Sequence, residues 1–329
     1  MPWGFAPSRA SAVALDAARH DDLGDSLAHL AEAFGATPGW GAPARDARAA
    51  ADAVRAGRRV PPAAFAQYFD LGEAGLGGDL ARATEAAAAL AAAAPRGPGR
   101  PVRARGRAGA LDALLERRMG DEAAQFAPID AATAERFAAR LDEGLALLRA
   151  GAPDLHGEVD VLVREVLVAR APAGAAMEFD GASHYQFWGL LILNPDHHPD
   201  RLAMAEVLAH EAGHSLLFGL TRDEPLTTNP TETRYASPLR RDPRPMEGIF
   251  HATFVSARMA WAMDRLSRAD ACTAEERARA RELGAHDARN FAAGRAVIAE
   301  HGALTPSAAA VLAEVDAALA ALDATAGAG

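Results

Sequence analysis

The sequence predicts a mainly helical α+β protein, with a helical N-terminal half, a small β-sheet in the middle and further helices after it. Apolar residues recur at three- and four-residue spacing in both outer parts, which is the period of a helix packed on a core. Two short runs near the middle are β-branched or continuously apolar, which favours buried strands. The 329 residues are 50% hydrophobic and 24% charged, enough for a sizeable core in one large domain or two ordinary ones.

The first half predicts helices that Gly/Pro turns separate. These helices are Ser8–Ala18, Leu23–Phe34, Pro43–Arg55, Pro62–Asp70, Gly78–Ala94, Ala110–Arg118 and Thr133–Ala150. Between them, Pro95–Gly109 is rich in Pro, Gly and Arg and has no period. We expect a solvated surface loop there, with a basic docking arm as the alternative.

The sheet is expected from two segments in the middle of the chain. Residues 164–170 include the β-branched Val166 and Val168. Phe187–Leu193 is a continuous apolar run that an Asn-Pro pair follows, as expected for a buried strand.

Helices return in the last third of the chain. Asp200 can cap a helix over Arg201–Gly219, and a loop rich in Thr, Pro and Arg is expected over 221–246. The remaining helices are predicted over Gly248–Arg268, from the Thr273/Glu276 capping box to His301, and from Thr305–Pro306 onward.

Composition excludes several classes of protein. The net charge of −10 opposes nucleic-acid binding. Cys272 is the single cysteine, which excludes an intrachain disulfide and a C-x-x-C metal site and fits a reducing cytoplasm. We find no secretory signal, and no window has the roughly 18 apolar residues of a membrane span, so we expect a cytoplasmic protein without membrane contact.

The chemistry is carried by the sequence EVLAHEAGHSLLFG at 206–219. His210, Glu211 and His214 form an H-E-x-x-H motif, in which histidines at i and i+4 project from one helix face and can chelate one metal ion. Glu211 lies beside them, as general base on a metal-bound water or as a residue that orients a ligand. We therefore expect a helical N-terminal region over 1–157 and a metal-binding catalytic region over 158–329, which can pack as one unit.

A third metal ligand must come from elsewhere in the chain. The position three turns after His210, where some peptidases have a third histidine, is Leu220. We favour His251, near the start of a later helix, and keep Glu247 and Glu232 as alternatives.

Two arginines are candidates for holding an anionic cofactor. Arg258 follows His251 by two helical turns, about 10 Å along the same face, where its guanidinium could bind a carboxylate whose other end chelates the metal. The alternative for Arg258 is an ion pair with a surface acid such as Asp264. Arg244 is the second candidate.

The other histidines carry weaker signals. We expect His197 and His198 to be solvated in a loop, and His184 to be a turn residue or a group that faces substrate. Without ligand spacing, we expect a surface position for His20, His29, His156, His286 and His301.

From the residues alone the leading interpretation is a zinc hydrolase, in which Glu211 activates the metal-bound water for attack on a peptide carbonyl. A catalytically silent peptide-binding module is a further alternative, which the intact motif opposes. Stoichiometric metal in the purified protein would separate the two.

Residues 187–260 resemble a known family. The segments FWGLLILNP, LAHEAGHSLLFGL and YASPLRRDPRPMEGIFHATFVSARM are similar to the H-E-x-x-H putative peptide-modification proteins found beside ribosomally made peptide precursors. The run from Arg244 to His251 is the most diagnostic part, and the strong resemblance covers about a quarter of the chain.

The resemblance implies an iron(II)- and 2-oxoglutarate-dependent oxygenase that uses O2 to hydroxylate a Cβ of a precursor peptide. It implies His210, His214 and His251 as iron ligands, with Arg258 or Arg244 on the distal carboxylate of 2-oxoglutarate. Two histidines and one carboxylate are the more usual iron set. Glu247 or Glu211 would therefore be the carboxylate if one contributes.

Overall fold

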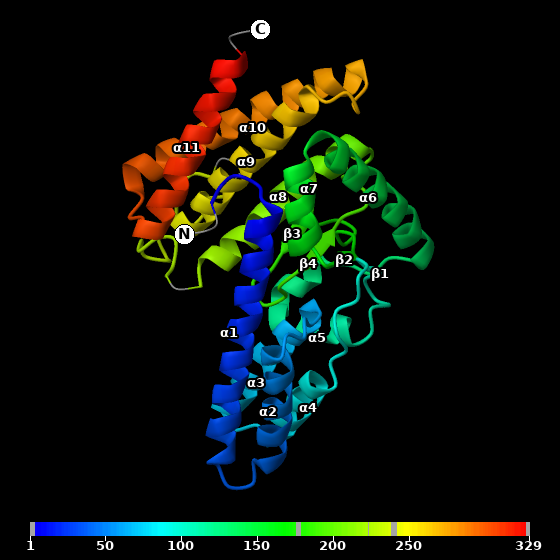
Figure 1. The fold of residues 1–329 in the computed structure, drawn as a ribbon, viewed down its shortest axis with the longest axis vertical. Helices are drawn as coiled ribbons and strands as arrows, with labels where there is room; N and C mark the ends of the chain where they lie inside the picture. The colour runs from blue at the N-terminus through cyan, green and yellow to red at the C-terminus, as the bar shows by residue number, and fades with distance from the viewer. Residues whose placement is uncertain (1–3, 176–178, 223, 238–241, 327–329) are drawn as a thin grey trace. The chain divides into compact units, whose positions relative to one another are not determined.

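The computed structural model describes residues 4–175, 179–222, 224–237 and 242–326. Over these residues, eleven α-helices and one 3-10 helix accompany a four-stranded mixed sheet, which confirms the expected mainly helical α+β class (Figure 1). The chain divides into two compact units. Unit 1 contains Met1–Ala12, Ala139–Val161 and His197–Gly329, and unit 2 contains Val13–Ala138 and Leu162–Asp196.

The units do not coincide with the two regions expected from the sequence. The expected boundary after residue 157 falls inside helix α7 (Pro153–Leu162), which the sequence did not predict. Each unit draws residues from both expected regions, because the chain passes between the units more than once.

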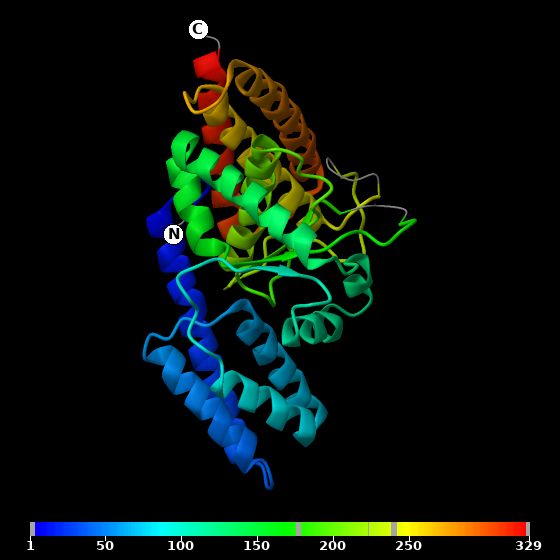
Figure 2. The ribbon, with the colours of Figure 1, turned by 90° about the vertical axis from the view of Figure 1, so that its right-hand side faces the viewer.

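Helices α1 to α4 make up a large part of unit 2. They are α1 (Arg9–Gly35), most of which lies in this unit, α2 (Gly41–Arg55), α3 (Pro62–Gly77) and α4 (Leu80–Ala91). They lie side by side in two perpendicular views (Figures 1 and 2). We expected a break between Ala18 and Leu23, but α1 is continuous there, because His20 is buried in the packed face of the helix.

The sheet of unit 2 has the strand order β1-β2-β4-β3. Its strands are β1 (Val102–Ala104), β2 (Glu165–Val168), β3 (Gly181–Ser183) and β4 (Leu190–Leu193). The central pair β2 and β4 is parallel and fully buried, as expected from the β-branched residues of 164–170 and the continuous apolar run Phe187–Leu193. Helix α5 (Ala110–Met119) and the 3-10 helix η1 (Gly120–Gln125) follow β1 in this unit.

Strand β1 corrects the expected loop at Pro95–Gly109. Val102 and Ala104 pair in parallel register with Val166 and Val168 of β2. A segment of three residues after a proline is too short for its β propensity to predict a strand. It forms a strand because it pairs with β2.

Unit 1 is built around a buried helix. Helix α9 (Met246–Ser267) contacts α8 (Arg201–Leu220), α10 (Ala274–His301) and α11 (Pro306–Ala326), and its residues 249–260 are all buried. Helix α6 (Ala131–Gly151) ends in this unit. None of the helices in the described ranges has the length and apolarity that a membrane crossing requires.

Candidate metal centre

The H-E-x-x-H motif lies on α8, where the sequence placed it. Asp200 caps the helix by accepting hydrogen bonds from the backbone N–H groups of Leu202 and Ala203, at 3.0 and 2.9 Å. Between Leu202 and Leu220 almost every residue is buried. The exceptions recur every four residues and are Glu206, His210, His214 and Phe218. One narrow face of α8 is therefore partly open to solvent, and both motif histidines lie on it.

Helix α9 brings the third histidine to this face. His251 lies in the second turn of α9 and is 8% exposed. Gly213, inside the motif, allows the close approach of the two helices, because a Cβ there would lie 3.1 Å from Cγ1 of Val255 and 3.4 Å from Cγ of Arg258. The histidine that the sequence favoured as a third metal ligand thus lies beside His214.

The three imidazole rings contact one another in the order His210, His214, His251. Nε2 of His214 lies 3.1 Å from Nε2 of His210, and Nδ1 of His214 lies 2.9 Å from Nδ1 of His251. The Phe218 ring is 5.3 Å from the His251 ring and 6.4 Å from the His214 ring, so it shields one side of the cluster.

The cluster fits a transition-metal ion in its donors, although the side chains do not converge. Among the described residues, no group of three or more His, Cys, Asp or Glu side chains is arranged to hold a metal ion as it stands. The reason is that His214 turns a different nitrogen to each neighbour. Two nitrogens about 3 Å apart have the spacing of adjacent ligands on one ion, so His210 and His214 already match.

Burial keeps the His251 imidazole neutral at neutral pH. Burial, and then the nearby positive charge of His210, lower the pKa of His251 to about 4. A neutral imidazole is the form that ligates metals, so His251 is in that form at neutral pH.

Glu211 lies close to the histidines. Its side chain is 2% exposed, and its Oε1 is 3.9 Å from Nε2 of His210. A carboxylate at this position can act on a group bound beside His210 or can orient that ring.

Arg258 has a different role from the one that the sequence suggested. It is 1% exposed, donates a hydrogen bond to the carbonyl of Phe5 at 2.6 Å, and forms a buried ion pair with Glu158 of α7. Asp264, the acid we expected as its alternative partner, pairs with Arg268. The Arg258 guanidinium is committed to protein groups, so its geometry opposes a role in binding 2-oxoglutarate.

Arg244, the second candidate, is more exposed than Arg258. It lies just before α9, and its backbone exchanges two hydrogen bonds with Tyr235, at 2.8 and 2.9 Å. Its guanidinium is 2.8 Å from Asp242 and its side chain is 38% exposed, so a ligand can reach it.

The alternative carboxylate ligands are both exposed. Glu247 lies in the first turn of α9, one turn before His251. Glu232 lies in a turn, where the Thr231 hydroxyl donates to it at 3.1 Å. Both side chains are more exposed than those of His210, His214 and His251.

Two histidines correct the expectations for the rest of the chain. His20, expected at the surface, is fully buried, and His198, expected to be solvated, is 4% exposed. His184 is partly buried in unit 2, with its ring centroid 4.7 Å from that of Tyr185. Neither His20 nor His198 lies in a spacing pattern that distinguishes a buried histidine from an exposed one.

Sequence reasoning missed two acidic residues of unit 1. Glu206 lies on the partly open face of α8, one turn before His210. Asp287 of α10 is 3% exposed and contacts Glu206. The four-residue spacing from Glu206 to the motif was a usable signal, whereas nothing in the sequence marked Asp287.

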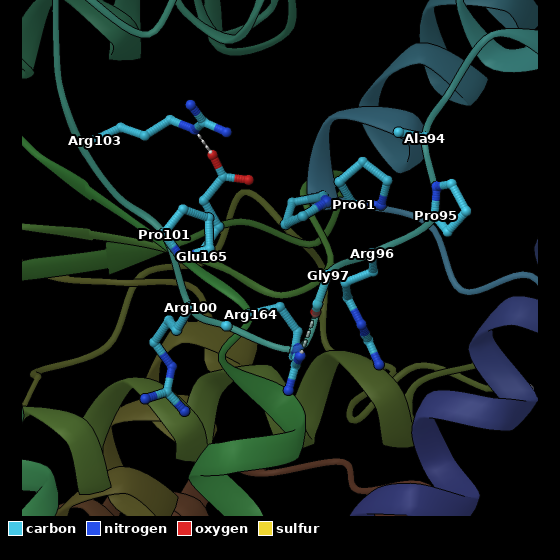
Figure 3. Close-up of a pocket in the computed structure, with 12 residues that line it drawn as sticks. Pro61, Ala94, Pro95, Arg96, Gly97, Arg100, Pro101, Arg103, Arg164 and Glu165 are labelled. Carbon is cyan, nitrogen blue, oxygen red and sulfur yellow. Dashed lines mark hydrogen bonds and ion pairs between the residues drawn. The ribbon is translucent and has the colours of Figure 1, made fainter.

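A pocket of about 510 Å³ in unit 2 is lined largely by residues of the Pro/Gly/Arg-rich segment Pro95–Gly109 (Figure 3). Its arginines bind protein groups: Arg103 pairs with Glu165, Arg164 donates to the Gly97 carbonyl at 3.2 Å, and Arg100 donates to the Val163 carbonyl at 2.7 Å. The candidate metal ligands, Glu211 and the two candidate arginines belong to unit 1 and do not line this pocket.

Comparison with known proteins does not assign the chain to a family. No model of a known protein family matches the chain, and no curated protein matches it either.

Proposed function

We propose that the protein is an iron(II)- and 2-oxoglutarate-dependent oxygenase that hydroxylates a Cβ in a ribosomally synthesised peptide. The observation that carries the proposal is the contact of His210, His214 and His251, which come from two helices and lie on a partly open helix face. The resemblance of residues 187–260 to peptide-modifying proteins supplies the reaction class.

The residues of the chain have distinct tasks in this proposal. His210, His214 and His251 would hold the iron, which when bound supplies the one-electron chemistry that O2 activation needs. Arg244 binds the distal carboxylate of 2-oxoglutarate. Glu211 orients His210 or a water molecule beside it. In the net reaction one O2 atom enters the peptide as a hydroxyl and the other enters succinate, while the 2-oxoglutarate carboxylate leaves as CO2.

The remaining expectations belong to the same proposal. The net charge of −10 opposes a nucleic-acid substrate, and the single cysteine fits a reducing cytoplasm, where precursor peptides are made. The peptide substrate is therefore proposed to be a precursor met in the cytoplasm.

One observation favours a second candidate, a zinc metallopeptidase. The buried Glu211 carboxylate lies 3.9 Å from His210, which suits a general base acting on a metal-bound water. In this alternative Glu211 removes the proton from the attacking water.

The first test is spectroscopic and needs no peptide. The metal-free protein is loaded with iron(II) under argon, 2-oxoglutarate is added, and the visible charge-transfer band is recorded. We expect a band in the wild type, its loss in His251→Ala and its weakening in Arg244→Ala. The matched controls His286→Ala and Arg234→Ala change exposed residues of unit 1 and should leave the band intact.

Two results would contradict the oxygenase. One is the absence of a band in an iron-loaded wild type. The other is tight zinc retention with peptide cleavage that Glu211→Gln abolishes, which would establish the peptidase instead.

A further inference from the structure

Residues 4–8, which we call the N-terminal strap, are tied to unit 1 through their main-chain groups. The Phe5 N–H donates a hydrogen bond to Oε2 of Glu314 on α11 at 2.9 Å. The Ser8 N–H donates to Oε2 of Glu158 on α7 at 3.3 Å. Segments near a chain terminus are commonly poorly ordered unless such contacts hold them. The strap is therefore a held part of unit 1.

The strap is also fixed to α9, the helix that carries His251. The Phe5 side chain is 1% exposed, and its ring packs edge-to-face on Phe254 with the centroids 5.8 Å apart. The Phe5 carbonyl accepts a hydrogen bond from the Arg258 guanidinium at 2.6 Å. The same guanidinium forms an ion pair with Glu158, which the strap also contacts. Both groups that hold Arg258 thus involve the strap.

Arg258 connects the strap to the motif helix α8. A Cβ added at Gly213 would lie 3.4 Å from Cγ of Arg258, so the stem of this arginine lies against the motif backbone. Gly213 directly precedes His214, and Arg258 follows His251 by two helical turns. The contact therefore lies between the two helices that supply the three histidines.

We propose that the N-terminal strap sets the metal affinity of the histidine cluster, because it holds Arg258 against Gly213 and so fixes the spacing of α8 and α9. Arg258 is a positioning residue in this arrangement. Ligands from two helices bind one ion well only if the helices are held at the right distance, and losing a group that orients ligands typically weakens metal binding about 10–100-fold. The inference rests on the metal centre of the proposed function and not on its oxygenase reaction.

Coupling between two sites is reciprocal. A strap that strengthens metal binding must itself be held more firmly when a metal is bound. A strap that only stabilises the fold would not respond to the metal in this way. The hydrogen exchange of the strap amides, which include the bonded N–H groups of Phe5 and Ser8, reports the difference.

The first measurement titrates Co²⁺ alone into metal-free, full-length protein and follows its visible absorption. We expect Phe5→Ala, which removes the ring from Phe254, to raise the Kd for Co²⁺ about 10-fold. Glu314→Ala removes the acceptor of the Phe5 N–H and should raise the Kd in the same direction. Glu314 is exposed, so this variant is expected to fold even if Phe5→Ala does not.

The matched control is Asp316→Ala. It removes another acid of α11, which pairs with Arg295 at 3.1 Å and is not bonded to the strap. The Kd for Co²⁺ should stay at the wild-type value.

The second measurement needs no change in the strap. Hydrogen exchange of residues 4–8 is followed by mass spectrometry in the wild type with and without Co²⁺. We expect Co²⁺ to slow this exchange and expect His251→Ala to abolish the slowing.

Two results would overturn the inference. One is wild-type affinity for Co²⁺ in the folded Phe5→Ala and Glu314→Ala variants, and the other is strap exchange that Co²⁺ leaves unchanged. A strap effect on Co²⁺ binding without a band from iron(II) and 2-oxoglutarate would refute only the oxygenase. A wild type that binds no Co²⁺ would refute the metal centre, and the inference with it.

Discussion

Two buried histidines of this protein, His20 in unit 2 and His251 in unit 1, differ in what surrounds them. His20 is fully buried, its Nδ1 lies 2.7 Å from the Asp16 carbonyl, and its Nε2 accepts a hydrogen bond from the Val60 N–H at 3.1 Å. His251 is nearly as buried, but the contact on its Nδ1 is another imidazole, at 2.9 Å.

Burial lowers the pKa of both rings, so neither burial nor protonation distinguishes them. The partners do. Backbone groups hold both nitrogens of His20, which makes it a structural residue that ties α1 to Val60. Three imidazoles in contact form few hydrogen bonds that water could not replace, so they add little to the stability of the fold. Their ring nitrogens are suitable metal ligands. A buried polar group can therefore be interpreted from its partners.

Arg258 extends the comparison to a charged group and should give the largest effect. Arg258→Ala leaves Glu158 buried without its partner, so we expect unfolding to become easier by about 3–5 kcal/mol. Urea unfolding measures the change. Arg268→Ala, which breaks a more exposed pair with Asp264 at the end of α9, should cost about 0–1 kcal/mol. A small cost for Arg258→Ala, with loss of the 2-oxoglutarate band, would return Arg258 to the cofactor site.

Substituting the two histidines tests the comparison directly. His20→Ala strands the buried N–H of Val60, so we expect a loss of about 1–3 kcal/mol in the free energy of unfolding. Iron content after loading should not change. His251→Ala should cost less stability in metal-free protein and should reduce iron affinity by about 100-fold or more. Equal iron loss in both variants would show that the distinction is wrong.

The Asp287 carboxyl group gives the opposite dependence on pH from a buried histidine. Its pKa is raised to about 8 in the folded protein, against 3.8 as its ordinary value. The folded state thus keeps a proton that the unfolded chain releases, and this advantage is lost as pH rises from about 4 to about 8. For metal-free protein the slope from this group is at most about 1.4 kcal/mol per pH unit. Asp287→Asn should flatten that part of the profile, and an unchanged slope would contradict the assignment.

The smallest effect is expected at Glu247, which shares a helix face with His251 but is exposed. Glu247→Gln should change the free energy of unfolding by less than about 0.5 kcal/mol and should leave iron content unchanged. Loss of iron in this variant would make Glu247 the third ligand and would remove His251 from the metal site.

The sequence predicted the parts of the fold and site that depend on local spacing. The helices of the C-terminal part and the central strands followed from periodicity and apolar runs, because those patterns record which side of an element is buried. The motif helix was recognisable because histidines four apart must share a face. The strand β1 and the continuity of α1 were missed, since both depend on partners remote in the sequence.

What the sequence by itself determined is the helical α+β class and the joint position of His210, Glu211 and His214. The tertiary structure decided which remote side chains meet: His251 with His214, Arg258 with Glu158, and Asp287 with Glu206. These pairs lie 37, 100 and 81 residues apart in the chain. Helix periodicity fixes neighbours only within a few turns, and contacts between helices depend on how whole faces pack.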